Sequence, residues 1–190
     1  STVYPGATEN IFLDYLNKKF EIGKDFFLCY SPERINPGVE GKIKYVDTTK
    51  VVSGYTNNCK VLAANFYKLL FKKVHLAENI RIAETSKLYE NAYRSVNIGL
   101  ANQMKMIADK MKINIHKVID ASSTKPFGFT KFIPGPGLGG HCIPIDPIFL
   151  SWTAKKYKSN AKFIDLARKV NLDVTNWIIK KIFSYIKKNK

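Results

Sequence analysis

The sequence lacks any long apolar run. No stretch approaches the roughly 20 consecutive apolar residues that cross a bilayer, and the first residues do not have the order of a signal peptide. We therefore expect a soluble, cytoplasmic protein without a membrane partner. With 45% apolar residues in 190, the chain can bury the core of one full domain or two small ones, which excludes intrinsic disorder.

Arginine is scarce among the cationic residues. Of 31 Lys and Arg residues only four are arginine, and the formal net charge is +16. Proteins that bind nucleic acid more often cluster their cations and use arginine to grip phosphates and base edges. Here the lysines are spread over the whole chain. This charge suits an anionic small substrate, and a basic nucleic-acid-binding domain is a remote alternative.

Cysteine is also rare. Cys29, Cys59 and Cys142 form no CxxC pair and no zinc-like spacing with histidine, so we expect neither a disulfide framework nor a bound metal. Cys29 lies within an apolar run and Cys59 opens a helical pattern, which predicts small buried side chains for both. Cys142 differs, because it follows two glycines that let a backbone approach a ligand closely.

Residues 1–78 alternate between helical and strand patterns. Short apolar runs predict strands and amphipathic stretches predict helices; the strands are expected over about 26–30, 50–53 and 73–77, and the helices over about 8–20 and 59–70. Strands separated by helices predict a parallel sheet with crossover connections, of which only the last units are present here. The fold class of this part is therefore α/β.

From residue 79 onward the pattern is all-α. Apolar side chains three and four residues apart predict one long helix over 79–111, about 45 to 50 Å in length. So long a helix favours a second subunit packing along it, and a helix that simply crosses between two domains is the alternative. We expect an ordered, functional loop over 123–146. Shorter helices are predicted over 115–122, 147–157 and 161–190.

Cys142 is the first candidate for chemistry. Asp146 and Pro147 have the residue types of a helix N-cap and first helical residue, which places the thiol four residues from a helix N-terminus. The positive end of that helix, with His141 or a lysine, favours the thiolate and predicts a nucleophile. An incidental cysteine in a glycine-rich turn, and a plain helix cap at Asp146, are the alternatives.

Two further segments carry candidate residues. Lys87, Asn91 and Arg94 share one face of the long helix, where a lysine and an amide can hold a substrate oxyanion. An ordinary solvated face is the alternative. Glu33 lies in SPERINPG, just after the strand over 26–30, where the loops of parallel sheets bind ligands. It would act there as an acid or base, unless Glu33 and Arg34 are simply solvated.

Taken together, these segments resemble the UDP-glucose/GDP-mannose dehydrogenase family, the nucleotide-sugar 6-dehydrogenases. The motifs, in the family's order and approximate spacing, are STVYPGAT, YSPERINPG, AETSKLYENAYRSVNIGL and PGPGLGGHCIPIDP. The resemblance implies NAD-dependent oxidation of C6 of a UDP-sugar to the uronic acid, in polysaccharide precursor synthesis. It also implies that residues 1–78 are the C-terminal part of a Rossmann-like NAD-binding domain and that 79–190 are the central helical domain, which forms a homodimer through its long helix.

The resemblance implies catalytic roles residue by residue. Cys142 would be the nucleophile that forms a thiohemiacetal and then a thioester. Lys87 would stabilise alkoxide or oxyanion charge, with Asn91 beside it on the substrate. Asp146 would order the water or balance Lys87, and Glu33 would assist hydrolysis of the thioester.

The resemblance also implies binding positions and missing parts. Thr2 would lie near the nicotinamide and the catalytic water. The family's GxGxxG turn for NAD should lie upstream of Ser1 and its UDP-binding domain should follow residue 190, so we expect a central fragment that turns over little UDP-sugar alone. The substrate-binding positions implied besides Lys87 and Asn91 are Arg94, Lys131, Phe132, Ile133, Pro134, Gly135 and Gly139.

Two departures bear on the identity of the sugar. UDP-glucose enzymes often carry a glutamate where this chain has Pro37 and a lysine where it has Ile145. Both differences resemble the branch that oxidises UDP-N-acetylhexosamines. We therefore expect UDP-N-acetylglucosamine first and UDP-N-acetylmannosamine second, with UDP-glucose as a remaining alternative. A non-catalytic dimerisation module is the competing function, and the presence of every catalytic position favours the enzyme over it.

Overall fold

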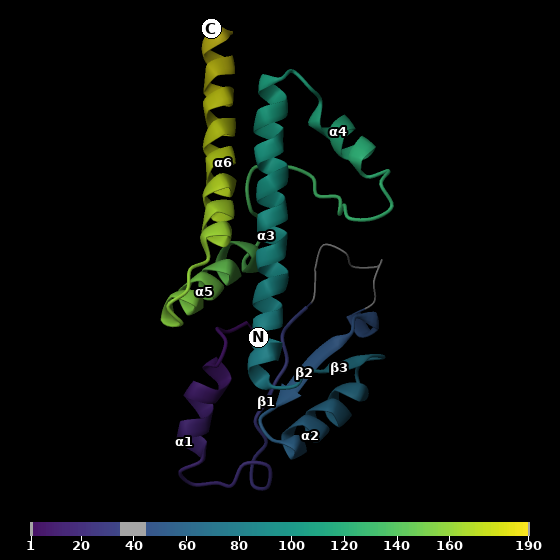
Figure 1. Ribbon diagram of the computed structural model, residues 1–190, viewed down its shortest axis with the longest axis vertical. Coiled ribbons are helices and arrows are strands. Elements are labelled where there is room, and N and C mark those ends of the chain that lie inside the picture. Colours follow the sequence, from purple (N-terminus) through teal and green to yellow (C-terminus); the bar gives the residue numbers. More distant parts are fainter. Residues whose placement is uncertain (1, 35–44, 190) are drawn as a thin grey trace. The chain divides into compact units, whose positions relative to one another are not determined.

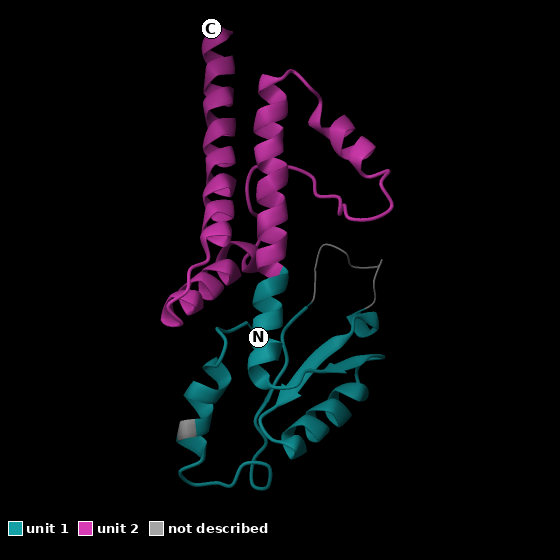
Figure 2. Cartoon of the chain, viewed as in Figure 1, with its two compact units in different colours: residues 1–90 teal, residues 91–190 magenta. Residues whose placement is uncertain are grey.

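The computed structural model describes residues 2–34 and 45–189, which fall into two compact units, 1–90 and 91–190 (Figure 2). Pro37, one of the two departures, lies outside the described residues. The long helix α3 (Ile80–Lys110) begins in the first unit and continues in the second, close to its predicted bounds. Among the helices of the described ranges, none combines the length and apolarity that crossing a membrane requires.

The first unit is an α/β arrangement around a sheet with the strand order β1-β2-β3 (Figure 1). All of its predicted elements are present, with bounds that shift by a few residues. The strands are β1 (Cys29–Tyr30), β2 (Lys50–Gly54) and β3 (Val74–Leu76); the helical segments are η1 (Glu9–Leu13), α1 (Asp14–Leu16), the 3-10 turn η3 (Tyr45–Asp47) and α2 (Asn57–Lys68).

The sheet is mixed. β2 and β3 pair in parallel, as predicted, because α2 supplies the crossover between them. β1 pairs antiparallel with β2, so the prediction of a parallel strand is wrong at this position. An apolar run carries no signal of strand direction, since either pairing buries the same side chains. Gly54 ends β2 where a Cβ would lie 2.5 Å from the backbone of Cys59, which lets α2 cross the strand closely.

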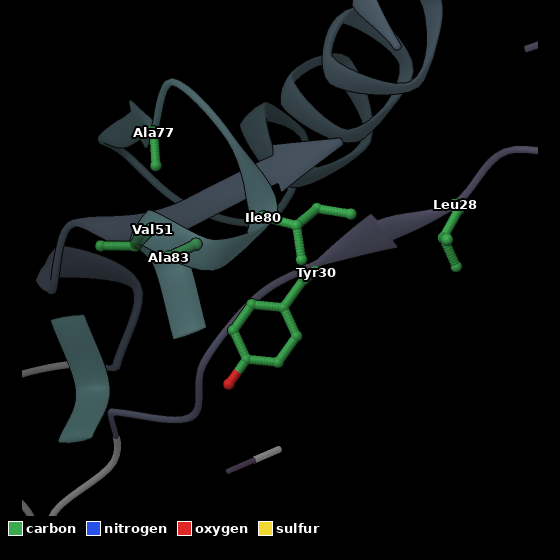
Figure 3. Close-up of a cluster of buried hydrophobic side chains, with 6 residues drawn as sticks. All are labelled: Leu28, Tyr30, Val51, Ala77, Ile80 and Ala83. Carbon is green, nitrogen blue, oxygen red and sulfur yellow. The ribbon is translucent and has the colours of Figure 1, made fainter. Parts of the chain in front are cut away.

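The core of the first unit lies between the strands and the first turns of α3. Its buried apolar side chains come from segments far apart in the sequence (Figure 3). They are Leu28, Tyr30, Val51, Ala77, Ile80 and Ala83. α2 covers the sheet with Cys59 and Ala63, and it begins at Thr56, whose hydroxyl accepts a hydrogen bond from the Cys59 amide.

The second unit is all helical. Besides the later part of α3 it contains α4 (Ile115–Ser122), α5 (Cys142–Lys156) and α6 (Lys162–Lys188). α4 has its predicted bounds, and the Asn114 side chain caps it by accepting from the amide of His116. α6 runs beside α3 (Figure 1), and Gly99 lies where a Cβ would come within 3.1 Å of the Asn171 amide nitrogen. Ala108, Ile115 and Ile119 form a small apolar cluster.

The start of α5 differs from the prediction. The helix begins at Cys142 rather than Pro147, so Asp146 lies inside it and is not its N-cap. Pro144 falls in the first turn, where its missing N–H has no intrahelical acceptor to lose. Pro147 lies further in and leaves the Ile143 carbonyl without its usual intrahelical donor. The Asp146-Pro147 pair therefore lies in the interior of α5 and not at its start.

Candidate active site

Cys142 is the first residue of α5 and its side chain is exposed. The structure thus places the thiol at the helix N-terminus, closer than the four residues expected from the sequence. The first backbone N–H groups of a helix lack intrahelical partners and carry partial positive charge, which favours an anion. An exposed thiol in this position is accessible to an electrophilic ligand.

Asn91 and Asp146 are directly bonded. Nδ2 of Asn91, on α3, donates to Oδ2 of Asp146, on α5, at 2.5 Å. Both side chains are almost fully buried, with exposed fractions of 2% and 3%. A buried carboxylate needs such donors because burial without hydrogen bonds is costly. The bond therefore joins α3 to α5 four residues after Cys142.

The first part of the expected substrate loop packs against α3 and α4. The ring of Phe132 meets Tyr93 edge-on, with centroids 6.0 Å apart. Lys131 forms an ion pair with Asp120 at 2.7 Å, and its hydrogen bond and positive charge lower the pKa of that carboxyl. Ile133 is exposed.

The glycines of the loop lie in different surroundings. The amide of Gly135 donates to Oδ1 of Asn102 at 2.8 Å, so this part of the loop is anchored, and Pro134 beside it is half-buried. Gly139 is exposed, and no described atom lies within 4 Å of the position a Cβ would take. The backbone at Gly139 is therefore open to a ligand, as the glycine-rich sequence predicts.

The other polar residues of α3 divide between the two units. Lys87 is half-buried in the first unit, one helical turn before Asn91, and Arg94 is exposed in the second. The continuity of α3 confirms the shared helix on which the spacing argument depends.

Glu33 lies just after β1, as predicted, and faces a cation. Its carboxylate is 3.8 Å from Nζ of Lys50, a buried side chain that lies over the rings of Tyr67 and Phe71 at 5.4 and 5.3 Å. Burial, followed by the nearby Glu33 carboxylate, raises the pKa of Tyr45. Glu33 is therefore part of a charged cluster in the first unit and not a simply solvated side chain.

Arg34 is likewise held by specific partners. Its guanidinium forms an ion pair with Glu90 at 2.7 Å and donates to the carbonyl of Thr49 at 2.9 Å. A cavity of about 310 Å³ lies beside this pair, with His75 and Ser86 in its lining. The alternative of a solvated arginine is therefore wrong.

Thr2 is half-buried at the start of a segment that a buried carboxylate holds. Glu84, on α3, is fully buried and accepts three hydrogen bonds: from the amide of Gly6 at 2.5 Å, from the amide of Thr8 at 2.9 Å and from the Thr8 hydroxyl at 2.6 Å. Glu84 thus fixes the STVYPGAT segment to α3 within the first unit. The sequence patterns do not indicate a role for Glu84, although it belongs to a quoted motif, because its partners lie 78 and 76 residues away in the sequence.

Cys59 and Cys142 have the burial that the sequence predicts, whereas Cys29, predicted to be buried, is only half-buried. Cys59 is fully buried, and its sulfur accepts a hydrogen bond from the Thr56 hydroxyl. Cys29 donates to the Cys59 carbonyl at 3.2 Å, and burial together with Cys59 raises the pKa of Cys29 to about 11. Cys142 is the exposed thiol of the described chain.

A larger cavity of about 700 Å³ lies in the second unit between α3, α4 and the loop before Lys131. Aromatic and aliphatic side chains dominate its lining, among them Tyr93, Leu100, Met104, Phe127 and Phe129. Part of this lining continues along α3 as a row of exposed side chains spaced three, four and seven residues apart. We call this row the apolar stripe; it consists of Tyr93, Leu100, Met104, Ile107 and Met111.

Comparison with known proteins agrees with the motifs. The model of the UDP-glucose/GDP-mannose dehydrogenase family, central domain, matches residues 81–173. Protein CapL of Staphylococcus aureus is 41% identical over 192 residues, which cover 99% of this chain and 44% of CapL. The chain belongs to the UDP-glucose/GDP-mannose dehydrogenase family.

Other relatives within this family are named for acetamido sugars. The UDP-N-acetyl-D-glucosamine 6-dehydrogenase of Pseudomonas aeruginosa is 35% identical and matches 100% of this chain and 45% of its own length. The solved UDP-D-ManNAc dehydrogenase from Pyrococcus horikoshii superposes with a TM-score of 0.89 at 31% identity, covering 100% of this chain and 44% of that one. The chain therefore spans less than half the length of these family members.

The described residues do not form the family's dinucleotide site. Gly135, Gly137 and Gly140 match the letters of GxGxxG, but an irregular loop and not a β-strand leads into them. A dinucleotide turn needs the strand because the strand aims the following helix N-terminus at the pyrophosphate. In this chain the glycines therefore belong to the loop around the thiol.

Proposed function

We propose that this chain supplies the thiol centre of an NAD-dependent nucleotide-sugar 6-dehydrogenase that converts C6 of a UDP-N-acetylhexosamine to the carboxylate. UDP-N-acetylglucosamine is the first choice of substrate and UDP-N-acetylmannosamine the second. The names of the Pseudomonas and Pyrococcus relatives support these two sugars, and Ile145 agrees with this branch of the family. The activity is that of the whole protein, since the chain spans 44% of CapL.

The observation that carries the proposal is the buried hydrogen bond between Asn91 and Asp146. It fixes the N-terminal part of α5 four residues after Cys142, whose side chain is exposed. Because Nδ2 of Asn91 donates to Asp146, Oδ1 is the atom of this amide that can accept a hydrogen bond, as from a sugar hydroxyl. A structural helix contact has no need for an accessible thiol beside a buried carboxylate.

The first step assigned to this chain is capture of the C6 aldehyde. The Cys142 thiolate adds to the carbonyl carbon, a C–S bond forms, and the C=O π pair moves to the oxygen, which takes a proton to give the thiohemiacetal. Lys87 would stabilise the developing oxyanion, which in a closed site is worth roughly 100- to 1,000-fold in rate. Asn91 and the loop over 131–135, with Arg94 and Gly139, would hold the sugar nucleotide.

The second step is hydrolysis of the thioester. Water adds to the acyl carbon while Glu33 accepts its proton, the C–S bond breaks, and sulfur leaves as the thiolate together with the uronic acid. Asp146 would order this water or balance Lys87, and Thr2 would lie near it. NAD⁺, when bound, would accept a hydride in each of the two oxidations, while Lys87 would stabilise alkoxide charge on the substrate and Thr2 would lie near the nicotinamide.

The decisive experiment restores the missing flanks. Residues 1–190 replace the matching segment of the Pseudomonas aeruginosa relative, and NADH formation is followed by absorbance with three substrates: UDP-N-acetylglucosamine, UDP-N-acetylmannosamine and UDP-glucose. We expect turnover of an acetamido sugar, little turnover by the isolated chain, and loss of acid formation in Cys142→Ala. The matched control Cys29→Ala should retain turnover because its thiol is packed against Cys59.

The outcomes separate the parts of the proposal. Undiminished acid formation by Cys142→Ala contradicts the thiol mechanism. Preference for UDP-glucose contradicts the assigned branch but leaves the mechanism in place. Strong turnover by the isolated chain shows that the cofactor site has been misplaced.

A second role, self-association, is favoured by the apolar stripe and the cavity beside it. Large apolar side chains exposed in a row along one helix are typical of an interface. We propose that a second copy of the chain packs along α3 through this stripe, which gives a two-fold homodimer. A non-catalytic dimerisation module would show this association without the thiol chemistry.

A further inference from the structure

The loop over 134–137 is anchored to the helices by two buried asparagines. Oδ1 of Asn102, on α3, accepts from the Gly135 amide at 2.8 Å, and its Nδ2 donates to Oδ1 of Asn171, on α6, at 2.8 Å. Nδ2 of Asn171 donates in turn to the carbonyls of Ser95 at 3.1 Å and Ala167 at 3.0 Å. Both asparagines are buried, with exposed fractions of 0% and 3%. We call this chain of hydrogen bonds the amide relay.

The orientation of each amide in the relay is determined by its neighbours. Two carbonyls face one end of the Asn171 side chain, so that end must be the NH₂ group and the other end must be the oxygen. This oxygen requires the NH₂ group of Asn102, which leaves the Asn102 oxygen to face the loop. The carbonyls of Ser95 and Ala167 therefore determine, through the two amides, that an oxygen of Asn102 faces the Gly135 N–H.

A second contact anchors the same loop from α6. The Thr175 hydroxyl donates to the carbonyl of Pro136 at 2.6 Å, one helical turn after Asn171. Gly137 adopts a φ of +126°, and a Cβ there would lie 2.7 Å from Oγ1 of Thr175 and 3.1 Å from the Asn171 carbonyl. Only glycine fits this approach. Both anchors therefore converge on one turn of α6.

We propose that Asn102 and Asn171 are positioning residues that preorganise the loop for the sugar nucleotide. A Pro-Gly-Pro-Gly sequence has wide backbone freedom at its glycines, and ordering it on binding costs free energy. The relay removes that freedom before a ligand arrives, on the side of the loop that leads to Gly139 and Cys142. The binding of a UDP-sugar by the loop rests on the proposed function. The amide relay does not depend on it.

The relay is costly for a merely structural helix contact. An amide that is buried without its full set of partners destabilises the fold, and an apolar pair of similar size can pack two helices without that risk. The oxygen that Asn102 directs at the loop has no use in joining α3 to α6. Its partner is the backbone of the proposed binding segment.

The first test measures hydrogen exchange of the Gly135 amide in the 190-residue chain without ligand. In Asn171→Asp an oxygen faces the Ser95 and Ala167 carbonyls in place of the donor, so residue 171 should move away and no longer hold the Asn102 amide in place. Loss of the Gly135–Asn102 hydrogen bond should then raise the exchange rate of Gly135 about tenfold. The matched control Asn176→Asp adds the same charge at an exposed position of α6 and should leave the rate unchanged. An unchanged Gly135 rate in folded Asn171→Asp overturns the proposal.

Milder variants keep the test decisive if Asn171→Asp does not fold. Thr175→Val removes the hydrogen bond to the Pro136 carbonyl. Gly137→Ala separates the loop from Thr175, because the new Cβ would lie 2.7 Å from Oγ1 of Thr175. Both variants should raise the exchange rate of the Gly135 amide. Gly139→Ala, where no described atom lies within 4 Å of the new Cβ, is the control for exchange. If both variants exchange like wild type, the loop is not held by these anchors and the proposal is wrong.

A second test uses the chimeric enzyme and separates positioning from general stability. Thr175→Val and Asn102→Ser should raise the KM for the UDP-sugar about tenfold while the KM for NAD⁺ stays constant. A merely structural role would lower kcat through loss of folded enzyme and leave both KM values unchanged, which would overturn the proposal. If the chimera with an intact relay is inactive, the proposed function fails while the exchange result still decides the relay.

Discussion

The two units bury different kinds of side chains. Buried residues of the first unit include large apolar ones such as Val52, Phe71 and Leu88, whereas the second buries mainly alanine and hydrogen-bonded polar groups such as Asn102 and Asn171. Both units expose large apolar side chains, and in the second unit many of these lie along α3 and α6. The interior of the second unit is therefore specified mainly by hydrogen-bond geometry.

The largest difference is expected between the thiols. With a pKa of about 11, Cys29 is about one part in a thousand thiolate at pH 8, and Cys59 is buried. Limited alkylation at pH 8 followed by peptide mapping should therefore label Cys142 first by a wide margin. Labelling of Cys29 should rise about tenfold for each pH unit up to its pKa. Earlier labelling of Cys29 or Cys59 than of Cys142 contradicts the contrast between the units.

Glu84→Gln should selectively destabilise the first unit. The new NH₂ group faces a backbone N–H, so a buried donor loses its acceptor at a cost on the order of 2 to 3 kcal/mol. Alkylation of Cys59 in urea reports opening of the first unit, and the fluorescence of Trp152 and Trp177 reports the second. Only the Cys59 midpoint should fall. Glu78→Gln, an exposed control, should change neither midpoint.

Leu100→Lys should weaken self-association of the chain. It places a charge in the apolar stripe, where Leu100 is 57% exposed, so folding is little affected while an interface would bury the charge. Sedimentation over a range of concentrations should show a dimer for the wild type and a shift towards monomer for the variant. Leu62→Lys on α2, also at an exposed apolar position, is the control. A wild-type chain that remains monomeric at all concentrations rules out the dimer.

The smallest effect concerns the ion pair between Lys131 and Asp120. Because the folded-state pKa of Asp120 is lowered, the pair adds stability above the ordinary carboxyl pKa, and this stability is lost as pH falls through the lowered value. Both side chains are exposed, so the contribution is screened by salt. Asp120→Asn should therefore leave the thermal midpoint of the chain almost unchanged at neutral pH. A large decrease would show that the loop contributes more to the second unit than its exposure indicates.

The motifs specify which residue types the candidate site contains, whereas its geometry comes from the tertiary structure. The motifs placed Cys142, Asn91 and Asp146 in one site, and the structure bonds the last two. The helix start was wrong because Asp-Pro marks a cap only when the preceding residues are not helical. Glu84 and Asn171 were missed because their partners lie 78 and 69 residues away, and helical periodicity does not register such contacts.

The sequence by itself determined the family, the order of the elements and the contrast among the thiols, since motifs, periodicity and local composition act over a few residues. Only the tertiary structure decided the direction of β1, the start of α5 and the burial of Glu84 and Asn102. A polar side chain can be buried only where distant segments supply its hydrogen-bond partners. Those partners come close only once the chain has folded, so no local sequence pattern predicts these contacts.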